Sequence, residues 1–282
     1  MEEKKFAVLI DSDNVSYKYV KIILDEITNV GIATIKRIYG DWTSGKTHWK
    51  SVLLDYALTP MQQYAYTSGK NSTDSAMIID AMDILYTGDV DGFCIASSDS
   101  DFTKLATRLR EAGKIVIGMG EKHTPQPFVK ACSQFKYLDL IAENQSEKTT
   151  KTKTKSEKSA PISSKSTKSK KKSATQEQVE NTTTAKSDAI DKTEENSADA
   201  TTPIEEIRAT ILQLMESDDE NGLIPASKVG TILQNKFSDF DCRNYGCKKM
   251  ADLLKKLKIP TVKYADPNNP IPNAAILYIK VK

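Results

Sequence analysis

Hydrophobic and polar residues alternate with two different periods over the first half of the chain. Phe6 to Ile10 form a short apolar run, which is typical of a strand buried on both faces. Residues 15–30 carry apolar side chains at helical spacing and are followed by Gly31, a common helix stop. Further strands and helices are predicted at 33–39, 49–58, 61–66, 74–85, 92–96, 102–112 and 114–118. This rhythm predicts an α/β domain over residues 1–145, with a mainly parallel sheet and helices on both faces.

The pattern stops over residues 146–202, where Lys, Ser, Thr and Ala dominate and aromatic residues are absent. Such a composition buries too little apolar surface to offset the entropy of ordering, so a disordered linker is predicted. The linker is basic over 148–172 and net acidic over 177–206. Two interpretations of the basic part stay open: a solvated linker, or an arm that attracts nucleic acid.

Helical periodicity returns over residues 203–282, where Ile204, Ile207 and Ile211 begin one apolar helix face. Two more helices and two strand-like segments follow, at 227–237, 247–257, 261–264 and 275–281. Three short helices followed by a β-hairpin describe a small winged helix-turn-helix domain.

The composition excludes several classes of protein. The chain has 282 residues, enough for about two domains, and its net charge of +2 says little about partners. No run approaches the ~20 apolar residues of a membrane helix, and the charged N-terminus lacks a secretory apolar segment. Four cysteines without a CxxC pair and only two histidines argue against a zinc site, a disulfide framework and Ser-His catalysis. We therefore expect a cytoplasmic protein with reduced thiols and no membrane partner.

Acidic residues gather where the predicted strands end. Ligands of parallel α/β sheets bind at the carboxyl ends of the strands. One acidic segment follows the first predicted strand, another follows the fourth, and a third opens the helix at 74–85. The residues are Asp11, Asp13, Asn14, Asp74, Asp99 and Asp101, with Asp80 farther along that helix. We expect these side chains to converge on one edge of the sheet.

Several carboxylates at one edge repel one another, which raises their pKa values unless a cation neutralises them. Hard oxygen ligands of this kind suit Mg²⁺ or Mn²⁺, which activate water and stabilise charge on a phosphate during in-line displacement. The ordinary alternative is helix capping, which suits Asp74 in particular. Capping explains any one of these residues better than it explains all three segments together.

Three motifs in this order resemble the NYN domain, a family of PIN-like nucleases that includes the LabA-like bacterial proteins. They read Phe-Ala-Val-Leu-Ile-Asp-Ser-Asp-Asn, Asn-Ser-Thr-Asp-Ser-Ala-Met-Ile-Ile-Asp and Ile-Ala-Ser-Ser-Asp-Ser-Asp-Phe-Thr-Lys-Leu. The resemblance covers roughly residues 5–140 and implies a PIN-like three-layer fold with a metal-dependent endoribonuclease site. The implied catalytic residues are Asp11, Asn14, Asp74, Asp99 and Asp101. The implied ligands of Mg²⁺ or Mn²⁺ are Asp11, Asp74, Asp80, Asp99 and Asp101.

Residues 203–282 resemble the LOTUS domain, also called OST-HTH. The resemblance rests on the helix that begins at Ile204 and on Phe-Asp-Cys-Arg-Asn-Tyr-Gly-Cys-Lys-Lys-Met-Ala-Asp-Leu-Leu at 240–254. That family implies RNA binding or docking of a protein partner. Lys and Arg at this density bind phosphates, and Tyr stacks on unpaired bases. The expected RNA contacts are Arg243, Tyr245, Lys248, Lys249, Lys255 and Lys256. The alternative is a solvated helix face with Tyr245 in the core.

Three functions remain open at this point. The first is a metal-dependent endoribonuclease joined to an RNA-binding domain. The second is a phosphatase of the haloacid dehalogenase type, because Asp11-Ser12-Asp13-Asn14-Val15 fits its DxDx(T/V) signature. In that enzyme Asp11 would be the nucleophile and Asp13 the general acid, so replacing Asp13 separates the two. The third is an RNA-binding scaffold without catalysis.

Overall fold

The computed structural model describes residues 3–43, 48–64, 72–153, 201–217, 223–265 and 275–280. Among these residues, the strands of the N-terminal domain are β1 (Lys5–Asp11), β2 (Ile32–Gly40), β3 (Thr59–Gln62), β4 (Gly92–Ala96), β5 (Ile115–Gly120) and β6 (Gln134–Tyr137). Its helices are α1 (Val20–Thr28), α2 (Trp49–Asp55), α3 (Ser72–Thr87), α4 (Thr103–Glu111), α5 (Gln126–Ala131) and α6 (Leu138–Lys153). Short 3-10 turns at Tyr17–Tyr19 and Ser100–Phe102 lead into α1 and α4.

The strands form one parallel sheet in the order β3-β2-β1-β4-β5-β6. β1 lies between β2 and β4, and it is buried from Phe6 to Asp11 because helices cover both faces of the sheet. The strand order reverses at β1 and β4, since β2 and β3 lie on one side and β5 and β6 on the other. Open α/β sheets bind their ligands at such a reversal, outside the carboxyl ends of the strands.

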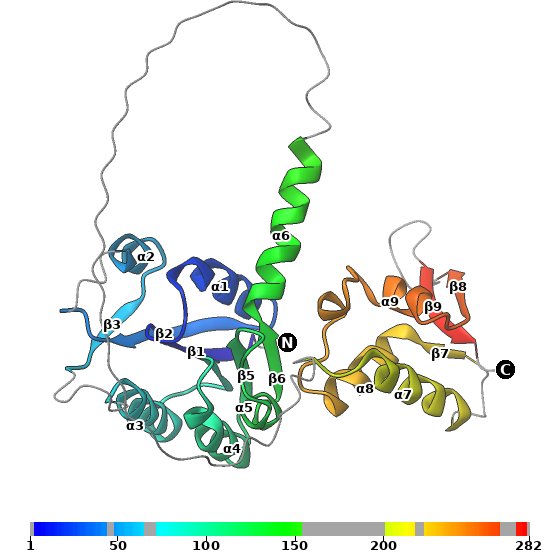
Figure 1. Ribbon diagram of the computed structural model, residues 1–282. Helices are drawn as coiled ribbons and strands as arrows, with labels where there is room; N and C mark the ends of the chain where they lie inside the picture. The colour runs from blue at the N-terminus through cyan, green and yellow to red at the C-terminus, as the bar shows by residue number, and fades with distance from the viewer. Residues whose placement is uncertain are drawn as a thin grey trace, which may run out of the picture.

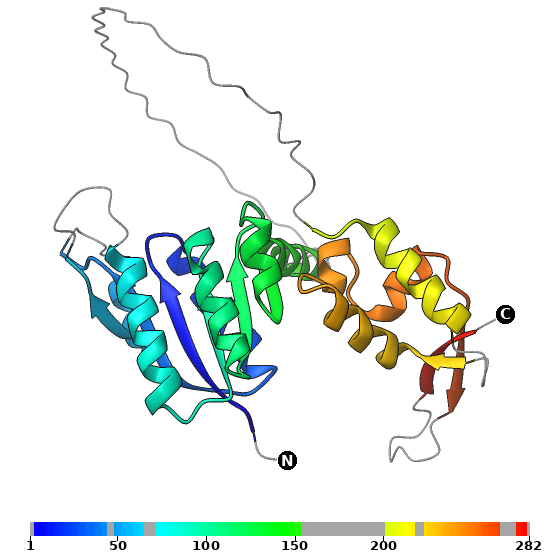
Figure 2. The same cartoon turned by 90° about the horizontal axis from the view of Figure 1, so that it is seen from below.

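Helices α1, α2 and α6 pack on one face of the sheet, and α3, α4 and α5 pack on the other (Figures 1 and 2). The predicted α/β class is confirmed as a three-layer domain, and its sheet is parallel throughout the described strands. α5, β6 and α6 were not among the predicted elements. α5 and β6 are too short, at six and four residues, for a repeating pattern to stand out, and α6 is polar after its first turn.

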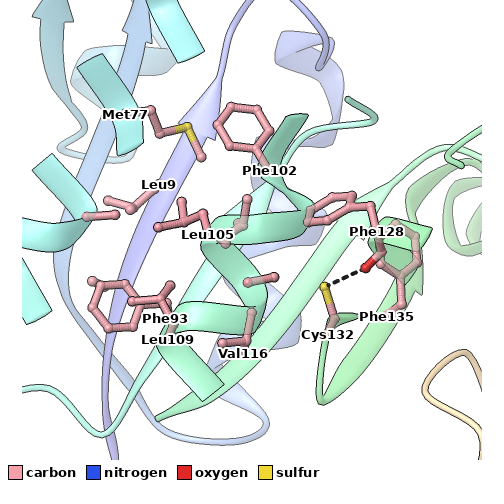
Figure 3. Close-up of a cluster of buried hydrophobic side chains, with 14 of the residues drawn as sticks. Leu9, Met77, Phe93, Phe102, Leu105, Leu109, Val116, Phe128, Cys132 and Phe135 are labelled. Atoms are coloured by element: carbon pink, nitrogen blue, oxygen red, sulfur yellow. Dashed lines mark hydrogen bonds between the residues drawn. The ribbon is translucent and has the colours of Figure 1, made fainter. Parts of the chain in front are cut away.

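The core beneath α3, α4 and α5 is formed largely by aromatic and long aliphatic side chains (Figure 3). Phe102, Phe128 and Phe135 are almost fully buried, and each contributes about 1.5–3 kcal/mol by leaving water. Close packing demands glycine at position 118, because a Cβ there would lie 2.5 Å from the Phe135 ring and 2.6 Å from the Cys132 sulfur. This rigid core holds the strand ends, and therefore the loops that follow them, in fixed positions.

The C-terminal domain contains α7 (Ile204–Ser217), α8 (Ala226–Lys236), α9 (Met250–Lys256) and an antiparallel sheet of β7 (Leu223–Pro225), β9 (Ala275–Lys280) and β8 (Thr261–Ala265). It is the small helical domain that the sequence predicts, with β7 as an additional strand. A Tyr-Gly turn precedes α9: Gly246 has a φ of 69° and ends the 3-10 turn Cys242–Tyr245. The loop between β8 and β9 lies outside the described residues.

α6 extends to Lys153, past the expected domain boundary at residue 145. Its sequence after that boundary contains no Pro or Gly that would stop a helix. The expected disordered linker otherwise falls on residues 154–200, which lie outside the described residues.

The two domains contact each other beside β6 (Figure 1). The backbone N–H of Phe135 donates to the Ser238 carbonyl at 2.7 Å, and the Ser238 hydroxyl donates to the Val129 carbonyl at 2.9 Å. Four charged side chains complete the contact, and we call them the interdomain charge network: Glu26, Lys136, Asp241 and Arg243.

Candidate active site

Asp11 ends β1 at the carboxyl edge of the sheet and is fully buried. Its Oδ1 accepts from the backbone N–H of Asp13 at 2.9 Å. Its Oδ2 accepts from the Asn14 side-chain amide at 2.8 Å and from the Ser97 hydroxyl at 2.9 Å. These donors offset the cost of burying a carboxylate and tie the end of β1 to the end of β4.

Three other carboxylates meet at this edge, and we call Asp74, Asp99 and Asp101 the acid trio. One oxygen from each lies within 4.8 Å of one oxygen from each of the others. Asp74 comes from the first turn of α3, while Asp99 and Asp101 follow β4. The trio ranges from buried Asp74 through half-buried Asp99 to exposed Asp101, so it is open to solvent on one side.

The electrostatics of the site are those of crowded negative charge. Burial of Asp74, together with the carboxylates of Asp11, Asp99 and Asp101, raises its pKa to about 6. Ionised Asp74 is therefore held at a cost in the folded protein, and a cation that binds the trio would remove this cost.

Asp99 caps a helical turn and also belongs to the acid trio. The Asp99 carboxylate accepts from the backbone N–H of Asp101 at 2.9 Å and caps the 3-10 turn that follows. The backbone N–H of Asp99 donates to the Ser97 hydroxyl at 3.1 Å. Ser97 thus contacts both Asp11 and the loop that carries Asp99 and Asp101, a role that we did not predict because a Ser after a strand is common.

Asp13 lies on the rim of the site. Its Oδ2 accepts from the Thr73 hydroxyl at 2.8 Å, which links the loop after β1 to the start of α3. The link holds α3 next to the loop, and so helps to place Asp74 near Asp11. Asp13 is exposed and is not a member of the acid trio.

The structure places Asp80 away from the acid trio, although we expected it among the metal ligands. Its carboxylate forms an ion pair with Arg37 and accepts a hydrogen bond from the Tyr39 hydroxyl, both on β2. Asp80 is six residues beyond Asp74, so the helix turns its side chain toward β2 and away from β4. A partner on a distant strand cannot be read from helix spacing, so the sequence does not point to Arg37.

The comparisons with known families agree with these two domains. The model of the NYN domain matches residues 5–139, and the model of the OST-HTH/LOTUS domain matches residues 202–272. The chain contains an NYN domain followed by an OST-HTH/LOTUS domain. The two domains together support a nuclease or a binding protein that acts on RNA.

Among solved structures, a protein of unknown function from Vibrio parahaemolyticus is similar, at 21% identity and a TM-score of 0.40. The similarity covers 48% of this chain and 94% of that one. No curated protein matches the chain.

In the LOTUS domain, three of the six expected RNA contacts are engaged within the protein. Arg243 donates to both carboxylate oxygens of Glu26, at 2.6 and 2.9 Å, and also pairs with Asp241. Tyr245 is buried, and its hydroxyl donates to the Thr202 carbonyl at 2.9 Å. Lys256 donates to the Tyr245 carbonyl at 2.8 Å. These contacts give Arg243 a role in the domain interface and place Tyr245 in the core, which was the alternative left open above.

The other three expected contacts, Lys248, Lys249 and Lys255, have exposed side chains. Lys248 and Lys249 line a cavity of about 540 Å³ between α8, α9 and the strand β9. Thr231 and Gln234 contribute polar groups to the same cavity. Within the described ranges, no helix combines the length and the apolar character needed to cross a membrane.

Proposed function

We propose that the chain is a divalent-metal-dependent endoribonuclease whose LOTUS domain binds RNA. The observation that carries the proposal is the acid trio, in which three carboxylates from two separate segments meet at the carboxyl edge of the sheet. The NYN family model over the same residues supports the reaction class. RNA as the substrate is supported by the presence of both domains.

The residues of this edge fit a bound Mg²⁺ or Mn²⁺. These ions prefer carboxylate oxygens, and the acid trio offers three within 4.8 Å of one another. The raised pKa of Asp74 also indicates a site with excess negative charge, which a cation would relieve. Asp74, Asp99 and Asp101 would hold the ion. When bound, it supplies an activated water and stabilises negative charge on the phosphate.

Two further side chains, Asp11 and Asn14, help to position the reacting groups. Asp11 accepts hydrogen bonds from Asn14 and Ser97. Its carboxylate acts electrostatically on Asp74, so its negative charge adds to the attraction for a cation. Asn14 is exposed and is fixed by its hydrogen bond to Asp11, so it can orient a water or a phosphate oxygen. Holding the reacting groups in one geometry removes much of the entropic barrier to the reaction.

We also propose that Lys248, Lys249 and Lys255 are the phosphate contacts of the LOTUS domain. Each neutralised phosphate releases counterions, so binding through these residues should weaken as salt increases. The interdomain charge network keeps this domain next to the NYN domain, which raises the local concentration of bound RNA near the acid trio.

The test is cleavage of a circular single-stranded RNA by the full chain, in Mn²⁺ and in EDTA. A circle has no ends, so linear products require an endonuclease. We expect cleavage only with Mn²⁺, and a loss of at least about 100-fold in Asp11→Asn and Asp99→Asn, since a bound metal stabilises the transition state by several kcal/mol.

Asp13→Asn is the matched control: its amide oxygen can still accept from the Thr73 hydroxyl, so a nuclease of this design should retain most of its activity. A phosphatase of the haloacid dehalogenase type would lose its general acid in that variant. Equal cleavage by wild type and Asp99→Asn would show a contaminating nuclease and would refute the proposal. RNA binding without any metal-dependent cleavage would leave the scaffold function instead.

A further inference from the structure

Four ring side chains lie in a row on the segments that follow β1 and β2, and we call them the aromatic ladder: His48, Tyr17, Trp49 and Trp42. The rings of His48 and Tyr17 are stacked, with centroids 5.6 Å apart and planes at 14°. Tyr17 meets Trp49 edge to face at 6.2 Å, and Trp49 meets Trp42 in the same way at 6.4 Å. The two tryptophans of the ladder are the only ones in the sequence.

Core packing accounts for one end of the aromatic ladder but not for the other. Trp49 is 5% exposed, and the indole N–H of Trp42 donates to the Met61 carbonyl at 3.2 Å. His48, at the opposite end, is exposed, and Tyr17 beneath it is only partly buried. An exposed imidazole stacked flat on a phenol adds little to the core, so this end of the ladder needs another explanation.

The ladder is placed at the same edge of the sheet as the acid trio. Tyr17 follows Asp11 after one tight loop, in which the backbone N–H of Val15 donates to the Asp11 carbonyl at 3.0 Å. The backbone N–H of Ser12 donates to the Tyr39 carbonyl at 3.0 Å, which joins this loop to the end of β2. His48 is in the connection from β2 to α2, so both members of the stacked pair extend from the carboxyl edge.

We infer that the stacked Tyr17–His48 pair binds an unpaired base of single-stranded RNA at the edge of the sheet that also carries the acid trio. The inference rests on the proposed function, because that function places a phosphodiester at the trio. Bases stack on the rings of Tyr, Trp and His, and each such contact strengthens binding by about five-fold to more than a hundred-fold. Aromatic rings also hold a nucleotide without adding negative charge to an edge that is already crowded with carboxylates. A base within a duplex cannot present its face to the pair.

Tryptophan fluorescence tests this directly, since both tryptophans lie in the ladder. The full chain is titrated at low ionic strength, in EDTA so that metal-dependent cleavage is absent, with a short single-stranded oligouridylate. The same RNA annealed to its complement is the second probe. We expect the single strand to quench the fluorescence and the duplex to leave it unchanged.

The variants His48→Ala and His48→Phe separate stacking from other effects. We expect His48→Ala to weaken the affinity for RNA, measured by quenching, about tenfold. His48→Phe should restore that affinity, because phenylalanine keeps the stacking face. In cleavage assays His48→Ala should raise KM with little change in kcat. Tyr86→Ala is the control, since Tyr86 is also an exposed ring but lies at the opposite end of α3 from Asp74.

The results distinguish this inference from the proposed function. Cleavage by a chain whose fluorescence does not respond to single-stranded RNA, or whose His48→Ala variant binds like wild type, would overturn the inference and leave the nuclease intact. His48-dependent quenching in a chain that never cleaves RNA would refute the nuclease and support the stacked pair as an RNA site.

Discussion

The acid trio and the interdomain charge network both bring carboxylates together, but they balance that charge in opposite ways. In the network, burial alone would raise the pKa of Asp241, yet hydrogen bonds from Arg243 and the charge of Lys136 lower it to about 2. In the trio, burial and neighbouring carboxylates raise the pKa of Asp74 to about 6. One cluster is neutralised by cations from the protein, and the other, under the proposed function, binds a cation from solution.

This difference separates a structural role from a chemical one. Carboxylates that hold a domain interface carry their own partners, because an unpaired buried charge would destabilise the fold. Asp80 shows the same principle inside the NYN domain, since its charge is balanced by Arg37. The acid trio keeps an unfavourable charge in the folded protein, which is what a metal site needs before its ion binds.

The largest expected effect comes from breaking the interdomain charge network. Arg243→Met should lower the free energy of unfolding by about 2–3 kcal/mol, below the value for a fully buried pair because the Arg243 side chain is 28% exposed. Urea denaturation measures this, and Arg208→Met, an exposed arginine on α7, should change it little. In a double-mutant cycle with Glu26→Gln, the two losses should not add; additive losses would show that the domains do not dock this way in solution.

The next effect concerns the acid trio and its ion. Mn²⁺ at about 100 times its dissociation constant should stabilise the wild-type chain by about 2.7 kcal/mol, seen as a rise in melting temperature. Asp99→Asn should remove most of this gain. Asp80→Asn should retain it, because the Asp80 carboxylate is engaged by Arg37 and Tyr39. An equal loss in both variants would return Asp80 to the set of metal ligands.

The pH dependence of Mn²⁺ binding sharpens the comparison. Asp74 must lose its proton to bind a metal, and its pKa is about 6. Affinity should therefore be nearly constant above about pH 7 and fall about tenfold per pH unit below about pH 6, or about 1.4 kcal/mol per unit. Calorimetric titration across this range measures it, with proton release increasing as the pH falls. Constant affinity down to about pH 5 would show that Asp74 is not a ligand.

The smallest effect is a gain in stability without metal. The pKa of Asp74 is higher in the folded chain than its ordinary value of 3.8, so the folded protein loses stability as pH rises from about 4 to about 6. Above that range Asp74→Asn should raise the free energy of unfolding by about 1 kcal/mol, because it removes the repelled charge. Asp25→Asn, on the exposed face of α1 and paired with Lys21, should bring no gain. A loss of stability in Asp74→Asn would mean that hydrogen bonds outweigh the repulsion.

Much of the fold could be predicted from local patterns. The apolar run from Phe6 to Ile10 predicted a central strand, and the structure places it between β2 and β4. Four elements escaped prediction. α5, β6 and β7 are three to six residues long, so neither helical nor strand periodicity could establish itself. α6 is longer, but its sequence is polar after the first turn and carries no repeating apolar face. β6 matters most among them, since the LOTUS domain docks beside it.

The sequence by itself determined the two domain families, the α/β class and the acidic segments at the strand ends, because these depend on motifs and on the order of strands and helices. Only the tertiary structure decided how each charge is balanced. In the folded chain Asp80 pairs with Arg37 and Arg243 pairs with Glu26, whereas Asp74 lies among other carboxylates. Electrostatic energy depends on distance and burial, and the partners in these pairs are far apart in the chain.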